Sequence, residues 1–221
     1  MKKYYSIPIW LCCTVVAFSQ TSYDSLYRKS TVYKNLTTLF SMSKTKSADI
    51  VFLGNSITFG GNWSELLGRE RVVNRGIGGD NTVGMLNRMH FVYQLKPKIC
   101  FLMAGINDLY ADAPVETIFR NYTMIVDTLR LHKIIPIIQS TLHVNPKWKR
   151  TEEKNPEVKR LNQMLQEYAA QHSILFIDLN AVLSTNGVLR DEFTGDGVHL
   201  TPNAYGVWRD VLEPVIQKHG L

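Results

Sequence analysis

The sequence predicts an α/β fold, a three-layer sandwich around a five-stranded, mostly parallel sheet. Two observations carry this prediction. Short apolar runs bounded by glycine or polar residues recur five times, and such runs are typical of strands buried on both faces of a parallel sheet. Segments in which apolar residues follow a helical spacing separate the runs, and this alternation is typical of a sheet with helices on both faces.

The first expected strand spans residues 50–54, after a helical lead-in within residues 21–48. Four apolar residues run directly into Gly54-Asn55-Ser56, so Ser56 stands just past the carboxyl end of the strand. Open α/β sheets bind their ligands at that edge. After the break at residues 60–62, helix-forming residues follow.

The second and third strands are expected at residues 71–75 and 98–104. The second runs into the glycine-rich turn 76–79, and a helix through residues 83–90 follows. After the third strand, Asp112 is expected to cap a helix that has Pro114 in its first turn, where a missing N–H costs little.

The fourth and fifth strands are expected at residues 134–138 and 174–179. Between them, the polar stretch 145–155 indicates a solvated loop, and a role as a mobile rim over a site stays open. Asn155-Pro156 is expected to open one helix and Thr201-Pro202 the last one. Right-handed crossovers leave few topologies, and we favour the flavodoxin-like strand order 2-1-3-4-5.

The amino terminus predicts a signal peptide over residues 1–19. Two lysines precede an apolar run, and small residues at Ala17 and Ser19 favour cleavage before Gln20. The run is too short for a comfortable membrane span. The protein is therefore expected to be exported to the periplasm or the medium, with one domain over residues 20–221.

A lipoprotein signal is the alternative for this segment, because Cys12 and Cys13 lie in the apolar run. No small residue precedes either cysteine, which disfavours it. Cys100 would be the one cysteine left after cleavage, so it forms no internal disulfide and is expected in the core.

Charge and motifs exclude several classes of partner. Without residues 1–19 the formal net charge falls from +6 to +4, and no basic stripe with interleaved aromatics indicates nucleic acid. No histidine pair has zinc-site spacing with a third ligand. The turn 76–79 lacks both the phosphate-loop lysine and the dinucleotide fingerprint. The sequence therefore predicts no cofactor and no metal.

Four segments at or after strand ends carry residue types suited to acyl transfer. They are expected to meet at one edge of the sheet, and they are Ser56, Gly78-Gly79-Asp80, Gly105-Ile106-Asn107-Asp108 and Asp196-Gly197-Val198-His199. A serine hydroxyl is a weak nucleophile and needs an adjacent base. His199 can take its proton, and Asp196 can hold the other ring nitrogen. The N–H groups of Ser56 and Gly79 and the Asn107 amide can stabilise an oxyanion.

These four segments, in this order, resemble the SGNH branch of the GDSL esterases and lipases. The resemblance covers about residues 48–217. It implies a flavodoxin-like sandwich with Ser56 as nucleophile, Gly79 and Asn107 completing the oxyanion hole, and Asp196 and His199 completing the triad. Asn55 departs from the family pattern, which has aspartate before the serine.

The resemblance extends to secreted bacterial carbohydrate O-acetylesterases and to members similar to platelet-activating-factor acetylhydrolase. It implies an exported serine esterase that removes O-acetyl groups from a small-molecule or glycan ester, on sialic acid or plant glycans. Asn55, Asp108 and His143 are further candidates for substrate contact. The oligomeric state stays open.

Two alternatives remain. A lysophospholipase or short-chain lipid esterase would use Trp63, Leu109 and Tyr110 as an apolar wall. A glycan-binding module on an inactive hydrolase scaffold would not need the complete set of reactive residues.

Overall fold

The computed structural model describes Tyr23 and residues 25–221, so the expected signal peptide lies outside the described residues. Five strands form one sheet in the order β2-β1-β3-β4-β5, and every neighbouring pair is parallel. The predicted strand order is therefore confirmed, and each strand lies within three residues of its expected bounds. The strands are β1 (Ile50–Gly54), β2 (Val72–Gly76), β3 (Ile99–Met103), β4 (Ile135–Gln139) and β5 (Leu175–Ile177).

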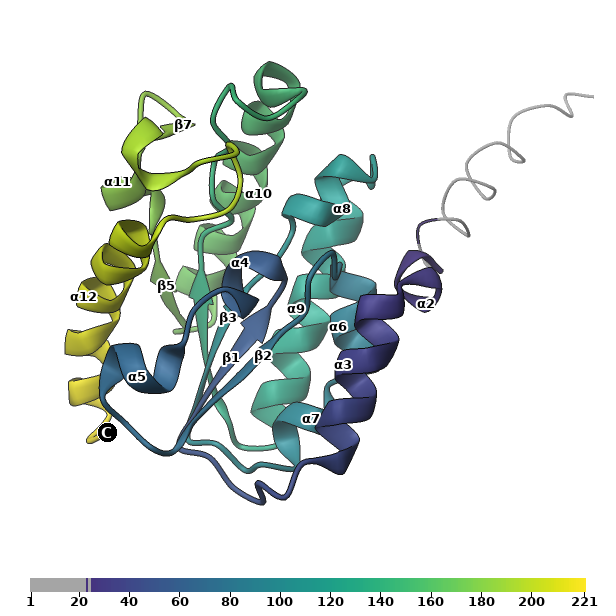
Figure 1. The fold of residues 1–221 in the computed structure, drawn as a ribbon, viewed down its shortest axis with the longest axis vertical. Helices are drawn as coiled ribbons and strands as arrows, with labels where there is room; N and C mark the ends of the chain where they lie inside the picture. The colour runs from purple at the N-terminus through teal and green to yellow at the C-terminus, as the bar shows by residue number, and fades with distance from the viewer. Residues whose placement is uncertain (1–22, 24) are drawn as a thin grey trace, which may run out of the picture.

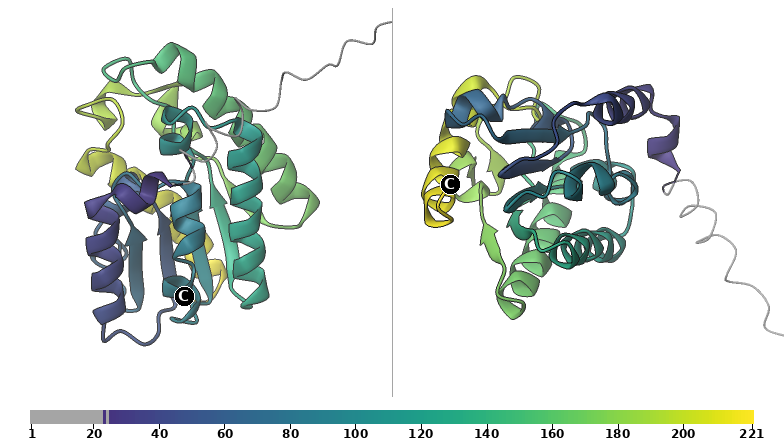
Figure 2. Two further views of the ribbon diagram at one scale, coloured as in Figure 1. Left: turned by 90° about the vertical axis from the view of Figure 1, so that its right-hand side faces the viewer. Right: turned by 90° about the horizontal axis from the view of Figure 1, so that it is seen from below.

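Helices cover both faces of the sheet, as Figures 1 and 2 show. One face carries α5 (Trp63–Leu67) and α12 (Pro202–Lys218). The other carries α3 (Thr31–Met42), α6 (Thr82–Asn87), α7 (His90–Tyr93), α9 (Val115–Leu131) and α10 (Thr151–Gln171). Short α2 (Leu26–Lys29) precedes α3, so the expected helical lead-in is present. Among the described helices, none is long and apolar enough to cross a membrane.

The core is closely packed around β1, which lies between β2 and β3. Its four apolar residues are at most 1% exposed, because helices cover both faces of the sheet here. The Phe52 ring stacks on Trp63 with centroids 4.1 Å apart, and Trp63 meets Trp208 edge-on at 4.6 Å. This aromatic stack joins α5 and α12 to β1, so it supports the strand that leads to Ser56.

Two expected helix starts are wrong. Helix α10 begins at Thr151 rather than at Asn155, and Pro156 lies inside it. The polar first turn is helical because Lys154, buried in the fold, pairs with Asp112 at 2.9 Å and with Glu157 at 3.0 Å. Asp112 itself has φ +57° and caps nothing; the residue at the start of α9 is Pro114.

Several short elements follow strand ends and had no clear periodic signal. Ser56 is the first residue of α4 (Ser56–Phe59), and α8 (Ile106–Tyr110) follows β3 directly. After β5 come α11 (Asn180–Leu183), the hairpin β6 (Ser184–Thr185) with β7 (Val188–Leu189), and the 3-10 turn η1 (Asp191–Phe193). They follow the carboxyl ends of the strands, and in Figure 1 α4, α8, α11 and β7 lie above the sheet.

Candidate active site

The fold brings Ser56, His199 and Asp196 into hydrogen-bond contact, although 143 residues separate the first two in sequence. The Ser56 Oγ lies 3.0 Å from His199 Nε2, and His199 Nδ1 lies 2.6 Å from Asp196 Oδ2. Both distances are within the range for a nucleophile joined to a base and a base joined to an orienting acid. The imidazole can therefore receive the serine proton on one nitrogen while the carboxylate holds the other.

The local backbone orients the carboxylate of Asp196. Its Oδ1 accepts the N–H groups of Val198 at 2.9 Å and His199 at 2.8 Å, so only Oδ2 faces the imidazole. Burial would raise the pKa of Asp196, but the hydrogen bonds from the His199 ring and from the two amides outweigh it and lower the pKa to about 2. Asp196 is therefore a carboxylate throughout the neutral range.

The segment 145–148 supports this loop from behind. Asn145 donates its N–H to the main-chain oxygen of Gly197 at 2.8 Å. Gly197 has φ +100°, and a Cβ there would lie 2.5 Å from the Trp148 nitrogen. Only glycine fits this close approach. The expected solvated loop is thus, in this part, a packed support for the loop that carries Asp196 and His199.

Ser56 is presented by the amino-terminal turn of α4. The Asn55 side chain accepts the Ile57 N–H at 3.0 Å and so caps this turn. Tyr205 of α12 donates its hydroxyl to the Ile57 oxygen at 2.7 Å, and the Trp63 indole donates to the Thr58 oxygen at 2.9 Å. These bonds attach the turn to α12 and α5, and they thereby fix the position of the Ser56 hydroxyl.

Two further candidate donors follow β2 and β3 at the same edge of the sheet. Gly79 has φ +73°, a conformation that glycine adopts readily, in the turn after β2. Asn107 lies in the first turn of α8, and its Nδ2 donates to the Asp80 oxygen at 2.8 Å. An amide nitrogen carries two hydrogens, so this bond fixes the orientation of Asn107 and leaves a second N–H for another acceptor.

Two of the residues expected to contact substrate point into the fold instead. Asn55 is 1% exposed and occupied as the cap of α4. Asp108 is fully buried, where its Oδ1 accepts from the Tyr23 hydroxyl, the Thr82 N–H at 2.9 Å and the Thr82 hydroxyl at 2.6 Å. Burial raises the pKa of Asp108. Both side chains support the site from below and do not line it.

His143 lies after β4 and lines a different hollow. A cavity of about 820 Å³ is bounded by His143, by Lys159 of α10 and by the loop between β6 and β7, and neither Ser56 nor His199 lines it. Burial lowers the pKa of His143, and its Nδ1 is buried without a hydrogen-bond partner. Among the described contacts, no hydrogen bond joins His143 to Ser56, His199 or Asp196, and its contact with substrate stays a prediction.

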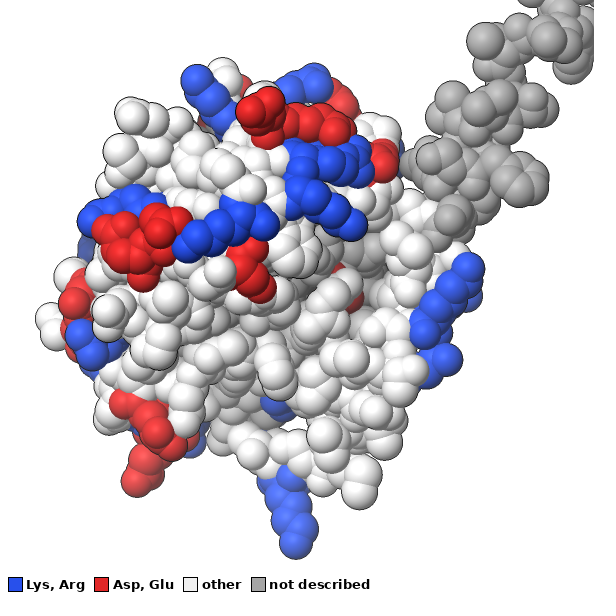
Figure 3. All heavy atoms as spheres, turned by 45° about the horizontal axis from the view of Figure 1, so that its top comes forward, with Lys and Arg blue, Asp and Glu red and all other residues white. Residues whose placement is uncertain are grey.

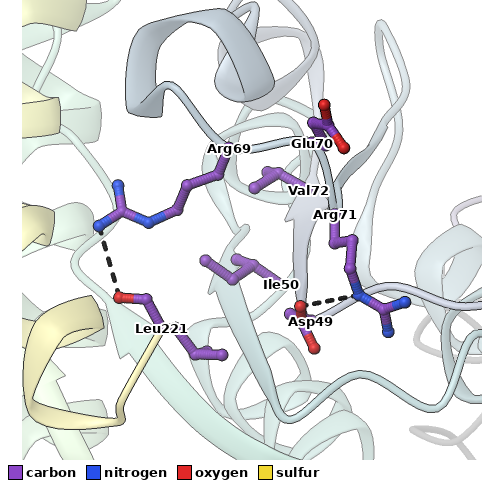
Figure 4. Close-up of a pocket in the computed structure, with 7 residues that line it drawn as sticks. All are labelled: Asp49, Ile50, Arg69, Glu70, Arg71, Val72 and Leu221. Carbon is purple, nitrogen blue, oxygen red and sulfur yellow. Dashed lines mark hydrogen bonds and ion pairs between the residues drawn. The ribbon is translucent and has the colours of Figure 1, made fainter.

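A smaller cavity lies at the opposite end of the sheet (Figure 4). Two arginines line it, but Arg69 is paired with Glu213 at 2.6 Å and Arg71 with Asp49 at 2.8 Å. Both arginines of this cavity are therefore already paired with carboxylates. At the carboxyl edge, acidic and basic side chains intermix around a mostly uncharged middle (Figure 3).

Two supporting residues escaped the sequence analysis. Thr194 accepts the Gly197 N–H and donates to the His199 oxygen, both at 2.8 Å, so its hydroxyl closes the loop that carries the acid and base. Arg88 is fully buried and paired with Asp80. A signal existed for Arg88: it falls in the apolar stripe that contains Met85 and Met89, and a charge there indicates a buried partner.

Comparison with known proteins agrees with this geometry. The sequence model of the GDSL-like Lipase/Acylhydrolase family matches residues 52–207. A protein described as an acylhydrolase from Bacteroides fragilis is 25% identical with a TM-score of 0.74, over 84% of this chain and 96% of that one. A lipase/acylhydrolase from Enterococcus faecalis is 26% identical with a TM-score of 0.69, over 78% and 96%.

The chain is also similar to part of a protein whose name specifies a different activity. An N-acylneuraminate cytidylyltransferase from Streptococcus agalactiae is 29% identical over 162 residues, which are 72% of this chain and 36% of that protein. The chain thus spans about a third of the length of this relative. The family match, by contrast, covers most of the sheet and reaches from Phe52 to Val207. The chain therefore belongs to the GDSL-like lipase/acylhydrolase family and is a hydrolase of ester bonds.

Proposed function

We propose that this protein is an exported serine esterase that removes O-acetyl groups from carbohydrates through an acyl-enzyme on Ser56. The observation that carries the serine mechanism is the chain of contacts from Ser56 Oγ to His199 Nε2 and from His199 Nδ1 to Asp196 Oδ2, at 3.0 and 2.6 Å. Export rests on the sequence of residues 1–19.

In the first half-reaction, the Ser56 oxygen attacks the ester carbonyl while His199 Nε2 takes the hydroxyl proton. The carboxylate of Asp196 holds the Nδ1 hydrogen and stabilises the imidazolium. Collapse of the tetrahedral intermediate breaks the bond to the alcohol oxygen, which receives the proton from Nε2. Water then attacks the acyl-enzyme by the same route in reverse, releasing the acid and restoring the Ser56 hydroxyl.

The developing oxyanion needs donors fixed before the reaction. The main-chain N–H of Ser56 is suited to this, because the first N–H groups of a helix have no partner within it. Asn107 keeps an N–H beyond the one that it donates to Asp80. With the Gly79 N–H, these groups form the proposed oxyanion hole.

A short acyl group is supported by the packing next to the site. Trp63 and Leu109 were candidates for an apolar wall that would bind a fatty chain, but both are at most 1% exposed within the core. Tyr110 alone of the three reaches the surface, where its hydroxyl donates to the Lys149 oxygen at 2.7 Å. Without that wall, an acetyl ester is favoured over a lysophospholipid.

A carbohydrate as the alcohol rests on the resemblance of the four reactive segments to secreted carbohydrate O-acetylesterases. O-acetylated sialic acid is the first substrate to test, followed by acetylated plant glycans.

Product identification tests the proposal. The mature protein is incubated with O-acetylated sialic acid, acetylated xylan and lysophosphatidylcholine, with Ser56→Ala alongside, and released acids are analysed by mass spectrometry. We expect acetate from the glycans in the wild type alone. Fatty acid without acetate would replace the carbohydrate proposal with the lipid one. Glycan binding without any serine-dependent acid would favour the inactive-scaffold alternative.

Replacing Asn107 with alanine should lower kcat by about 10²-fold with little change in KM, since the amide acts mainly on the oxyanion. Hydrolysis of p-nitrophenyl acetate gives both constants. Asn87→Ala is the matched control, because its amide is exposed on α6 and bonds only to the Val83 oxygen in the described structure. A loss below threefold in Asn107→Ala would remove Asn107 from the oxyanion hole.

A further inference from the structure

One fully buried cation lies beneath the candidate site. The guanidinium of Arg88, just after α6, donates from Nε to Asp80 Oδ2 at 2.7 Å, from Nη1 to the Arg75 oxygen at 2.7 Å and from Nη2 to the Gly54 oxygen at 2.9 Å. Taking a charge out of water costs several kcal/mol even when it is paired. Apolar side chains of similar volume often stabilise such a position as well or better, so stability alone is a weak reason for arginine here.

Each of the three bonds ends on a segment that carries a proposed oxyanion donor. Gly54 ends β1, two residues before Ser56. Arg75 lies in β2, whose end leads into the turn with Gly79. Asp80 follows Gly79 directly, and its main-chain oxygen holds the Asn107 amide at 2.8 Å. Arg88 thus joins the segments of Ser56 and Gly79 directly and reaches Asn107 through Asp80, while touching none of the reacting atoms.

The partner carboxylate is itself confined. Asp80 Oδ1 accepts the Asn81 N–H at 3.0 Å, and a Cβ at Gly84 would lie only 1.9 Å from that oxygen. Burial raises the pKa of Asp80 to about 6, and Arg88 acts in the opposite direction. The carboxylate therefore depends on Arg88 to remain charged in this place, and it has little room to move.

We propose that Arg88, together with Asp80, is a positioning pair that sets the spacing of the Ser56, Gly79 and Asn107 donors. This inference rests on the proposed serine mechanism. Donors stabilise a transition state only when they are held at hydrogen-bond distance from the oxyanion before it forms. A displacement of about 1 Å can cost about 10²-fold in rate. The fork of Arg88 supplies three of the restraints that prevent such a displacement.

Arg88→Lys is the first variant, because lysine keeps the charge beside Asp80 and loses the fork that spans Arg75 and Gly54. We expect kcat for p-nitrophenyl acetate to fall at least about 10-fold with KM nearly unchanged. A trifluoromethyl ketone forms a tetrahedral adduct, and we expect its inhibition constant to rise by the same factor by which kcat/KM falls. A purely structural role would lower the melting temperature and leave these two quantities unchanged below it.

Arg75→Lys is the matched control. Arg75 is also buried, and its side chain bonds to the Phe91 oxygen at 3.1 Å and to the Asn74 oxygen at 3.2 Å and lies over the Phe40 ring. Only its main-chain oxygen contacts Arg88, and lysine leaves that oxygen in place. It should lose stability and keep kcat within about twofold. A double variant, Asp80→Asn with Arg88→Met, removes both charges, so no unpaired carboxylate opposes folding. It should fold and still show the lower kcat.

The outcomes separate the two proposals. If Ser56→Ala retains turnover of p-nitrophenyl acetate, the serine mechanism fails and the positioning role fails with it. If turnover depends on Ser56 but kcat in both Arg88 variants stays within twofold of the wild type, the positioning role alone is overturned. Equal losses of kcat in Arg88→Lys and Arg75→Lys would also overturn it, because the effect would then reflect general destabilisation.

Discussion

Replacing Ser56 with alanine is expected to lower kcat/KM for ester substrates by about 10⁴-fold or more, because no other group can form the acyl-enzyme. The remaining rate would come from binding and the oxyanion donors. The fold should be unaffected, since the capping of α4 uses the Asn55 side chain and the Ile57 N–H. Steady-state hydrolysis of p-nitrophenyl acetate, with circular dichroism of the same samples, measures both.

Ser64→Ala is the matched control for this variant. Ser64 lies in α5, eight residues further along the chain, and should keep full activity. A fluorophosphonate probe adds an independent readout: intact-mass analysis should show one adduct on the wild type and none on Ser56→Ala. Labelling that persists in Ser56→Ala would place the nucleophile on another residue.

Replacing Asp196 with asparagine is expected to cost about 10⁴-fold in kcat, less than the loss of Ser56. The backbone geometry gives the reason. An asparagine oxygen would keep the two N–H groups of Val198 and His199, which leaves its NH₂ facing His199 Nδ1. The ring hydrogen would then be driven to Nε2, where it prevents acceptance of the Ser56 proton.

The same geometry predicts that Asp196→Ala is less damaging than Asp196→Asn, because water can then satisfy Nδ1 and the imidazole can choose its tautomer. Rates for both variants on one substrate decide this, with Asp191→Asn as control. Asp191 lies in η1 and pairs with Lys147 at 2.7 Å near the surface. Equal losses in Asp196→Asn and Ser56→Ala would contradict the expected ranking, and a slower Asp196→Ala would contradict the tautomer argument.

Local patterns in the sequence determined the sheet. Residues 50–53 form an apolar run closed by Gly54, and β1 spans Ile50–Gly54 as expected. Such runs identify buried strands because a strand covered on both faces must be apolar at every position. Right-handed crossovers left few topologies, and the order that we favoured among them is the observed one, which brings Ser56 and the Gly105-Ile106-Asn107-Asp108 segment to one edge.

Helix boundaries and side-chain directions depended on contacts that are distant in sequence. Asn155 looked like a cap before Pro156, yet its side chain bonds to Val144 from inside α10, which begins at Thr151. Asn55 and Asp108 each adjoin a predicted site residue, and both turn inward. Two residues that are adjacent in the chain lie close together, but their side chains can point in different directions. Adjacency to a site residue therefore could not identify a side chain that contacts substrate.

The sequence by itself determined which residue types arrive at the reactive edge: Ser56, Asn107, Asp196 and His199. Only the tertiary structure decided how they are held. The contact of 3.0 Å between Ser56 and His199 and the bond from Arg88 to Gly54 join segments that are remote in sequence, and the Thr194 hydroxyl closes the loop that carries the acid and the base. The geometry of these contacts depends on how the helices and the sheet pack against one another. The periodicity of apolar residues along the chain does not specify that packing.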